Sequence, residues 1–123
     1  MGLGSTLVIE NDLVLKRFYQ QALKNRCPTL HVVTSAREAM ELLETQLFDF
    51  VITDLQLPGE SSAAILDKAK KQNPHIKALV ASGYCDDEKY KEQMAPSGVV
   101  KGYLQKPFTI HQLLEKIENI LQN

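Results

Sequence analysis

The sequence predicts an α/β fold in which five parallel strands form a sheet that helices cover on both faces. Short runs of β-branched and other apolar residues alternate with amphipathic stretches along the chain, which is the pattern of βαβ units. Each short run is apolar almost throughout, as expected of strands that are buried on both faces. The 123 residues fit a single domain with an ordinary core.

The strands are predicted at the short apolar runs, and the helices at the stretches between them. A first helix is expected from about Asp12, which is predicted to cap it, to Asn25, and Pro28 prevents its continuation. Its predicted inward-facing residues, at helical spacing, are Leu15, Phe18, Tyr19, Ala22 and Leu23. Another helix, Ser62–Gln72, follows Pro58 and ends before Pro74. The predicted strands are Thr6–Ile9, Leu30–Val33, Phe48–Thr53, Ile76–Ala81 and Gly102–Leu104.

Two further helices begin with a capping box, in which a hydroxyl residue and a Glu or Gln three residues later satisfy backbone N–H groups. Ser35 and Glu38 open one of them, and Thr109 and Gln112 open the last helix, which is expected to reach the chain end. Their predicted buried stripes are Ala39, Met40, Leu42, Leu43 and Leu47 in the former, and Ile110, Leu113, Leu114, Ile117, Ile120 and Leu121 in the latter.

The stretch Asp86–Met94 carries the weakest helical signal. Only Tyr90 and Met94 are apolar, and they lie four residues apart on one face. A helix with so little apolar surface buries little against its neighbours, so we expect it to be lightly anchored and mobile.

Five βα units in a chain of this length indicate a flavodoxin-like, three-layer (βα)5 sandwich with the strand order 2-1-3-4-5. In such open sheets, ligands bind beyond the carboxyl ends of the strands, next to the point where the order reverses. The polar residues at the predicted strand ends are therefore the candidate site. They are Glu10, Asn11, Asp54, Ser82 and Lys106.

These residue types suit a metal ion and a phosphoryl group. Glu10, Asn11 and Asp54 bring two carboxylates and an amide oxygen to one cleft, and Mg²⁺ prefers such oxygen ligands. Ser82 and Lys106 offer a hydroxyl and an ammonium group, which would bind the oxygens of a phosphoryl group on Asp54. Each residue alone has an ordinary structural explanation as a turn, cap or surface residue. Their joint placement at one sheet edge favours a shared site.

Four segments at the predicted strand ends are informative together. They are Leu7-Val8-Ile9-Glu10-Asn11-Asp12, Asp49-Phe50-Val51-Ile52-Thr53-Asp54-Leu55-Gln56-Leu57-Pro58-Gly59, Ser82-Gly83-Tyr84 and Gly102-Tyr103-Leu104-Gln105-Lys106-Pro107-Phe108. In their order and spacing they resemble the receiver domains of two-component systems, from about Thr6 to Leu121. The leader Gly2-Leu3-Gly4-Ser5 and the last of the four segments resemble the C-terminal receivers of hybrid sensor histidine kinases.

The resemblance implies roles for the candidate residues. Asp54 would take a phosphoryl group from a histidine kinase or phosphotransfer protein, and Ser82 and Lys106 would bind that group. Mg²⁺ would be held by Asp54, Asn11, the backbone carbonyl of Gln56 and, through water, Glu10. Tyr103 and Ser82 would form a switch that reshapes the face of helix 4, strand 5 and helix 5 for a downstream protein. The peptide bond before Pro107 would be cis.

Two positions depart from the family's usual pattern. Receivers usually carry two aspartates where this chain has Glu10 and Asn11, so a neutral amide replaces one charge and Mg²⁺ should bind more weakly. Ser62 occupies a position that is commonly glycine, so the loop before it could differ in conformation.

The implied function is that of a phosphoacceptor that assists its own phosphorylation and dephosphorylation, with kinase activity only as part of a larger hybrid kinase.

Net charge and cysteine content narrow the possible binding partners and the cellular location. The formal net charge is −1, which argues against binding to nucleic acid or to a membrane. Cys27 and Cys85 show neither pairing nor metal-ligand spacing, which suits reduced thiols in the cytoplasm. Residues 1–5 are interpreted as a leader or linker remnant, and residues 6–123 as the receiver domain.

The sequence has three alternative interpretations besides the receiver. A degenerate receiver that acts as an unphosphorylated interaction module is the main alternative. A haloacid-dehalogenase-like phosphatase would need an aspartate where Gln56 stands, and a flavin-binding flavodoxin would need a phosphate-binding loop after the first strand. The acidic Glu10 and Asp12 would repel such a phosphate.

Overall fold

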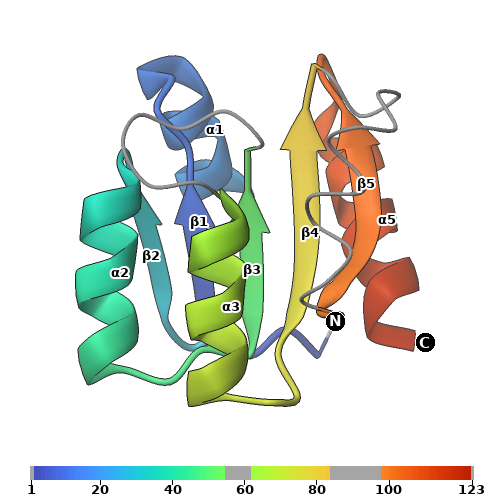
Figure 1. The fold of residues 1–123 in the computed structure, drawn as a ribbon. Helices are drawn as coiled ribbons and strands as arrows, with labels where there is room; N and C mark the ends of the chain where they lie inside the picture. The colour runs from blue at the N-terminus through green and yellow to red at the C-terminus, as the bar shows by residue number, and fades with distance from the viewer. Residues whose placement is uncertain (1, 55–61, 84–97, 123) are drawn as a thin grey trace.

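The computed structural model of the chain describes residues 2–54, 62–83 and 98–122. Its parallel strands form one sheet in the order β2-β1-β3-β4-β5, which confirms the predicted fold class and strand order (Figure 1). The strands are β1 (Thr6–Ile9), β2 (Leu30–Val33), β3 (Phe50–Thr53), β4 (Lys77–Ser82) and β5 (Val100–Gln105), and the helices are α1 (Leu13–Leu23), α2 (Ala36–Thr45), α3 (Ser62–Gln72) and α5 (Ile110–Gln122).

The helices lie in two layers, α2 and α3 over one face of the sheet and α1 and α5 over the other (Figure 1). Two clusters of buried side chains correspond to these layers. One joins β1, β3 and β4 to α2 and α3, and the other joins the opposite side of the same strands to α1 and α5. Because successive side chains of a strand point to opposite faces, the almost wholly apolar strands supply both clusters.

The helix caps are those that the sequence predicts. The Ser35 hydroxyl accepts a hydrogen bond from the Glu38 N–H, and the Thr109 hydroxyl accepts one from the Gln112 N–H. The Gln112 side chain in turn accepts from the Thr109 N–H. The capping is reciprocal at α5, and at both helices these bonds fix the point at which the helix begins.

Two residues of the predicted buried stripes are exposed instead. Leu47 is 66% exposed and Ile110 is 46% exposed. Helix α2 ends at Thr45, and the extended backbone of Gln46 takes Leu47 off the helix face that faces the sheet. Ile110 is the first residue of α5, and the buried residues of that helix begin one turn later, at Leu113. Their assignment to the core was wrong.

Strands β1 and β2 have the predicted bounds, whereas β3 begins two residues later than predicted and β4 is shifted by one residue. The largest difference is at β5, one of the two edge strands. Strand β5 is longer than the predicted Gly102–Leu104, because residues on both sides of that range also pair with β4. Lys101 and Gln105 are exposed, as expected for an edge strand that alternates between the core and solvent. That alternation interrupts the apolar run by which the strand was predicted.

Several predictions concern residues near or beyond the described ranges. The helix predicted at Asp86–Met94 lies outside them.

At the amino end, Leu3 is 4% exposed and packs in the cluster with α1 and α5. The N–H of Ser5 donates to the Asp49 carboxylate at 2.9 Å, so this segment contacts the fold directly. Within the described part of the chain, no helix is both long and apolar enough to cross a bilayer.

Candidate functional site

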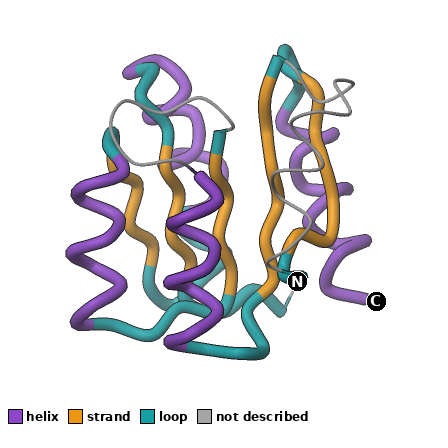
Figure 2. The backbone as a smooth tube through the Cα atoms, viewed as in Figure 1, coloured by secondary structure: helices purple, strands orange, loops and turns teal. Residues whose placement is uncertain are grey.

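The candidate residues come together at the edge of the sheet where the strands end. All neighbouring strands are parallel, and Ile9 at the end of β1 pairs with Thr53 at the end of β3. The arrowheads in Figure 1 mark the carboxyl ends of the strands, and Figures 1 and 2, drawn from the same side, show these ends at one edge of the sheet. The residues that follow these ends, Glu10, Asp54 and Lys106, are therefore neighbours although they lie far apart in the sequence.

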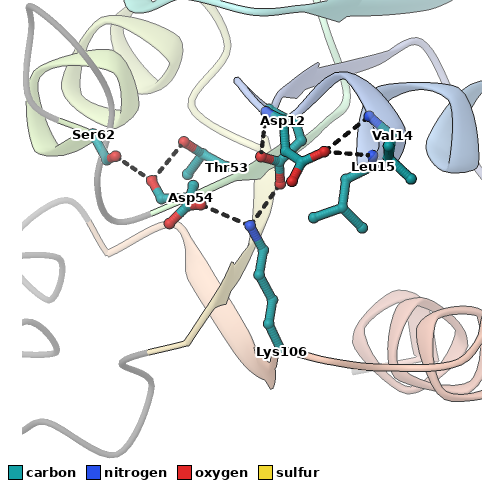
Figure 3. Close-up of polar contacts among 8 residues, drawn as sticks. Asp12, Val14, Leu15, Thr53, Asp54, Ser62 and Lys106 are labelled. Carbon is teal, nitrogen blue, oxygen red and sulfur yellow. Dashed lines mark hydrogen bonds and ion pairs between the residues drawn. The ribbon is translucent and has the colours of Figure 1, made fainter.

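Lys106 binds two carboxylates at the centre of this edge. Its Nζ lies 2.7 Å from Glu10 Oε1 and 2.7 Å from Asp54 Oδ2. The Lys106 side chain reaches toward Asp54 from its own strand end (Figure 3). The Glu10, Asp54 and Lys106 side chains are 2%, 13% and 18% exposed, so water screens these ion pairs only partly. The site holds one negative charge in excess.

The position of Lys106 is set by its main chain. Its N–H donates to the Ser82 carbonyl at 2.9 Å, which ties the end of β5 to the end of β4. The Lys106-Pro107 peptide bond is cis, as the family resemblance implied. The next residue, Phe108, packs edge-on against Phe18 with ring centroids 5.8 Å apart. The lysine is thus held by backbone pairing on one side and by aromatic packing on the other.

Glu10 is held by the loop that follows β1. Its Oε2 accepts a hydrogen bond from the Asp12 N–H at 3.1 Å, and its Oε1 binds Lys106. Asp12 itself caps α1, since its Oδ1 accepts from the N–H groups of Val14 and Leu15 at 2.8 and 3.2 Å. The predicted capping role of Asp12 is confirmed, and its Oδ1 is directed to the helix.

The main-chain carbonyl of Asp54 receives two hydroxyl groups. Thr53 Oγ1 donates to it at 3.0 Å, and Ser62 Oγ donates to it as well (Figure 3). Both donors are buried, with Thr53 0% and Ser62 1% exposed. The sequence singled out Ser62 only as a replacement for glycine, so its contact with Asp54 was missed. A serine at the start of a helix was the available signal.

The other candidate residues lie around this centre. Ser82 is 1% exposed at the end of β4. Asn11 follows Glu10 and is exposed. Tyr103 lies on β5 opposite Val80 and packs, half-buried, against the cluster with α2 and α3. Gln56 lies outside the described residues. The structure therefore brings Glu10 and Asp54 into direct contact with Lys106, and Ser82 lies beside them, because its carbonyl accepts from the Lys106 N–H.

The charge of Lys106 is stabilised by its two partners. Burial by itself lowers the pKa of Lys106, but the hydrogen bonds and charges of Asp54 and Glu10 outweigh it and hold the pKa above its usual value. Lys106 is consequently an ammonium ion at neutral pH. A fixed cation beside Asp54 is the group needed to neutralise negative charge that arrives there.

The oxygen donors at this edge fit a hard divalent cation. Two carboxylates and the Asn11 amide follow the ends of neighbouring strands, and Mg²⁺ is usually bound by one or two carboxylates together with waters and phosphate oxygens. Among the described residues no group of three or more His, Cys, Asp or Glu side chains forms a closed metal cage. A set of one or two carboxylates suits Mg²⁺, which keeps several of its own waters when so few protein ligands bind it.

Tyr19 connects the site to α1. It is 1% exposed, and its ring centroid lies 6.1 Å from that of Phe108. Burial raises the pKa of the Tyr19 phenol far above its usual value, and the charges of Glu10 and Asp54 raise it further. Sequence reasoning placed Tyr19 in the core without recognising that it lies within the field of the two carboxylates.

Tyr19→Phe should make the fold less sensitive to alkaline pH. Because the folded state raises the Tyr19 pKa, the stabilisation from its retained proton is complete below about pH 10 and is lost as the pH rises further. The variant should lose less unfolding free energy above about pH 10 than the parent. Urea denaturation at a series of pH values measures this, and deprotonation of Lys106 affects both proteins alike. Parallel pH profiles would contradict the prediction.

Comparison with known proteins decides the family. The family model of the response regulator receiver domain matches residues 6–118. The chain belongs to this family. As a receiver domain of two-component systems it is a phosphoacceptor module and not an enzyme of the ordinary kind. Receivers interact with histidine kinases and with downstream partners, and they generally require Mg²⁺ for phosphorylation.

Relatives of this receiver occur within longer proteins. It is 28% identical to part of the sensor kinase CckA of Brucella abortus, over 98% of this chain and 13% of that protein. It is 29% identical to the probable transcriptional regulator ycf29 of Pyropia yezoensis, over 94% of this chain and 52% of that protein. The receiver thus spans only part of the length of these curated relatives.

Solved structures show the same architecture. A receiver domain protein from Methanospirillum hungatei superposes with a TM-score of 0.85 at 25% identity, covering 98% of this chain and 95% of the other. The signal receiver domain of an HD domain-containing protein from Pseudomonas fluorescens gives 0.84 at 26% identity, with coverage of 98% and 95%. Both agree with the family assignment.

Proposed function

We propose that Asp54 is the phosphoacceptor of this receiver. The observation that supports it best is the contact of Lys106 Nζ with Asp54 Oδ2 at 2.7 Å, between side chains that are mostly buried. An ionised aspartate is an adequate nucleophile when it is correctly placed. Phosphoryl transfer needs positioning and charge neutralisation more than covalent assistance, and Lys106 supplies the neutralising charge.

The transfer is a displacement at phosphorus. An oxygen of the Asp54 carboxylate attacks the phosphoryl group of a phosphohistidine, the new O–P bond forms as the P–N bond breaks, and the electron pair leaves with the imidazole. Lys106 and the Ser82 hydroxyl bind the phosphoryl oxygens as the group arrives. Lys106 can move to the incoming group without losing all its partners, because it also contacts Glu10. In this sense the receiver assists its own phosphorylation and, with water as acceptor, dephosphorylation.

Glu10, Asn11, Asp54 and the Gln56 backbone carbonyl are proposed to hold Mg²⁺. When bound, Mg²⁺ would neutralise phosphoryl charge and orient the transferred group. Glu10 is the least direct of these donors, since Lys106 and the Asp12 N–H already occupy its two oxygens. This supports the proposal that Glu10 binds Mg²⁺ through a water molecule and not directly.

The switch and the partners follow from the same assignment. Ser82 and Tyr103 are proposed to move together on phosphorylation and to alter the face of helix 4, strand 5 and helix 5, where a downstream protein binds. The phosphoryl donor is a histidine kinase or a phosphotransfer protein. The net charge of −1 supports a protein partner over nucleic acid or a membrane surface. A cytoplasmic location, and an origin within a hybrid histidine kinase, are part of this proposal.

The decisive experiment is phosphorylation by a small phosphodonor with Mg²⁺. The wild-type protein should gain the mass of one phosphoryl group, and NMR signals of Tyr103 should shift with beryllofluoride as a phosphoryl mimic. Asp54→Asn should abolish both responses, because an amide is not a nucleophile of comparable strength. Asp67→Asn, an exposed aspartate on α3, is the matched control and should respond like the wild type.

Two results would contradict the proposal. A folded wild-type protein that responds to neither phosphodonor nor beryllofluoride would favour an unphosphorylated interaction module. Phosphorylation that persists in Asp54→Asn would place the acceptor elsewhere.

A further inference from the structure

We propose that Ser62 is a positioning residue for the phosphoacceptor. Its hydroxyl donates to the main-chain carbonyl of Asp54 (Figure 3), whereas the Asp54 side chain binds Lys106. The proposal deepens the function proposed above and rests on it.

The Ser62 contact joins two elements at the site. Asp54 follows the end of β3, and Ser62 is the first residue of α3, eight positions later. The hydrogen bond therefore fixes the start of the helix against the residue that carries the reacting carboxylate. Thr53 donates to the same carbonyl at 3.0 Å, but from the adjacent residue, so it cannot hold α3 in place.

Burial makes this contact effective. Ser62 is 1% exposed and Thr53 is 0% exposed, so water competes little for the carbonyl. With both donors in place, the peptide plane that follows Asp54 has a fixed orientation. Because side-chain direction depends on backbone dihedrals, this plane sets the direction from which the Asp54 carboxylate meets Lys106.

The Thr53 and Ser62 hydroxyls are placed to orient the Asp54 nucleophile and not to bind the phosphoryl group. Neither hydroxyl contacts Lys106, and both act on the carbonyl and not on the carboxylate of Asp54. Loss of the Ser62 hydroxyl should therefore disturb the alignment of the nucleophile while the groups that bind phosphoryl oxygens remain. Small errors in alignment have large effects on transfer rates.

The test compares Ser62→Ala and Ser62→Cys with the wild type in the small-phosphodonor reaction. Alanine removes the donor, and cysteine keeps nearly the same size but is only a weak donor. Both variants should lower the maximal rate constant of phosphorylation roughly tenfold. The half-saturating concentrations of phosphodonor and Mg²⁺ should stay within about twofold of the wild type, since the binding groups are intact.

Ser35→Ala is the matched control. It also removes a serine hydroxyl that serves the start of a helix, but Ser35 caps α2 by accepting from the Glu38 N–H and has no contact with Asp54. It should lower the melting temperature and leave the maximal rate constant unchanged. All rates are measured well below the melting temperature of the least stable variant, so that loss of folded protein does not contribute.

Two outcomes would overturn the positioning role. One is a wild-type maximal rate constant in the Ser62 variants, which would make the hydroxyl merely structural. The other is an unchanged maximal rate with weaker phosphodonor or Mg²⁺ saturation, which would make it a binding residue. Failure of the proposed function is distinct from both, because the wild-type protein itself would then not react.

Discussion

Replacing Lys106 with methionine should abolish detectable phosphorylation and lower the free energy of unfolding by about 3 kcal/mol. Methionine keeps much of the apolar stem but removes the ammonium group that binds Glu10 and Asp54, each at 2.7 Å. The Glu10 carboxylate, only 2% exposed, is then left buried without its counter-ion. Breaking such a pair by removing one partner is strongly destabilising. The value lies at the low end of the usual range because Lys106 is 18% exposed.

The functional loss has a separate cause. Without Lys106, the two carboxylates repel each other and repel the incoming phosphoryl group. Urea denaturation measures the first effect, and mass spectrometry after treatment with a phosphodonor measures the second. Both should be observed at neutral pH, where Lys106 is charged.

Lys101→Met is the matched control for this substitution. Lys101 lies on β5, the strand that Lys106 follows, and is exposed. Its Nζ donates to the Gly98 carbonyl, and among the described residues it forms no ion pair. That change should affect stability by less than about 0.5 kcal/mol and leave phosphorylation intact. Adding Glu10→Gln to Lys106→Met should recover part of the stability, because it removes the buried charge that lost its partner. Full stability in Lys106→Met alone would mean that the ion pairs contribute nothing.

Asn11→Asp should tighten Mg²⁺ binding by roughly tenfold, because it restores a carboxylate where this receiver has a neutral amide. Asn11 follows the buried Glu10 and is exposed, so a carboxylate there is open to a cation. The excess negative charge of the site would rise from one to two. The half-saturating Mg²⁺ concentration in the phosphodonor reaction measures the change.

The control for this prediction is Asn25→Asp, which makes the same change in charge beyond the opposite end of α1, at an exposed position. Its Mg²⁺ dependence should match that of the wild type. Equal Mg²⁺ dependence in Asn11→Asp and the wild type would mean that Asn11 is not a metal ligand. A decrease in Mg²⁺ affinity would contradict the electrostatic argument itself.

The sequence predicted the fold and the centre of the site because both depend on short-range patterns. Buried strands appear in the sequence as apolar runs, and the carboxyl ends of parallel strands lie at the same edge of the sheet. The proximity of Glu10, Asp54 and Lys106 follows from these two facts alone. Asp12 was identified as a cap from its position, and the structure confirms it.

The errors arose where the exposure or the contacts of a residue depend on where an element ends or on how two elements pack together. Leu47 fits the helical spacing of α2 but follows the end of that helix. The edge strand β5 was predicted too short because its exposed residues interrupt the apolar run. The hydrogen bond from Ser62 to the Asp54 carbonyl depends on how α3 docks against β3, whereas a serine at a helix start predicts only a local capping contact.

The hydrogen bond from the Lys106 N–H to the Ser82 carbonyl, 2.9 Å long, couples the two proposed phosphoryl-binding groups mechanically. Because this bond joins the ends of β4 and β5, a backbone shift that moves Ser82 along the sheet also moves Lys106. A mutation that changes the register of this strand pair would alter both contacts together. Tuning the lifetime of the phosphorylated state through one of these groups therefore requires changes in the side chain and not in the backbone.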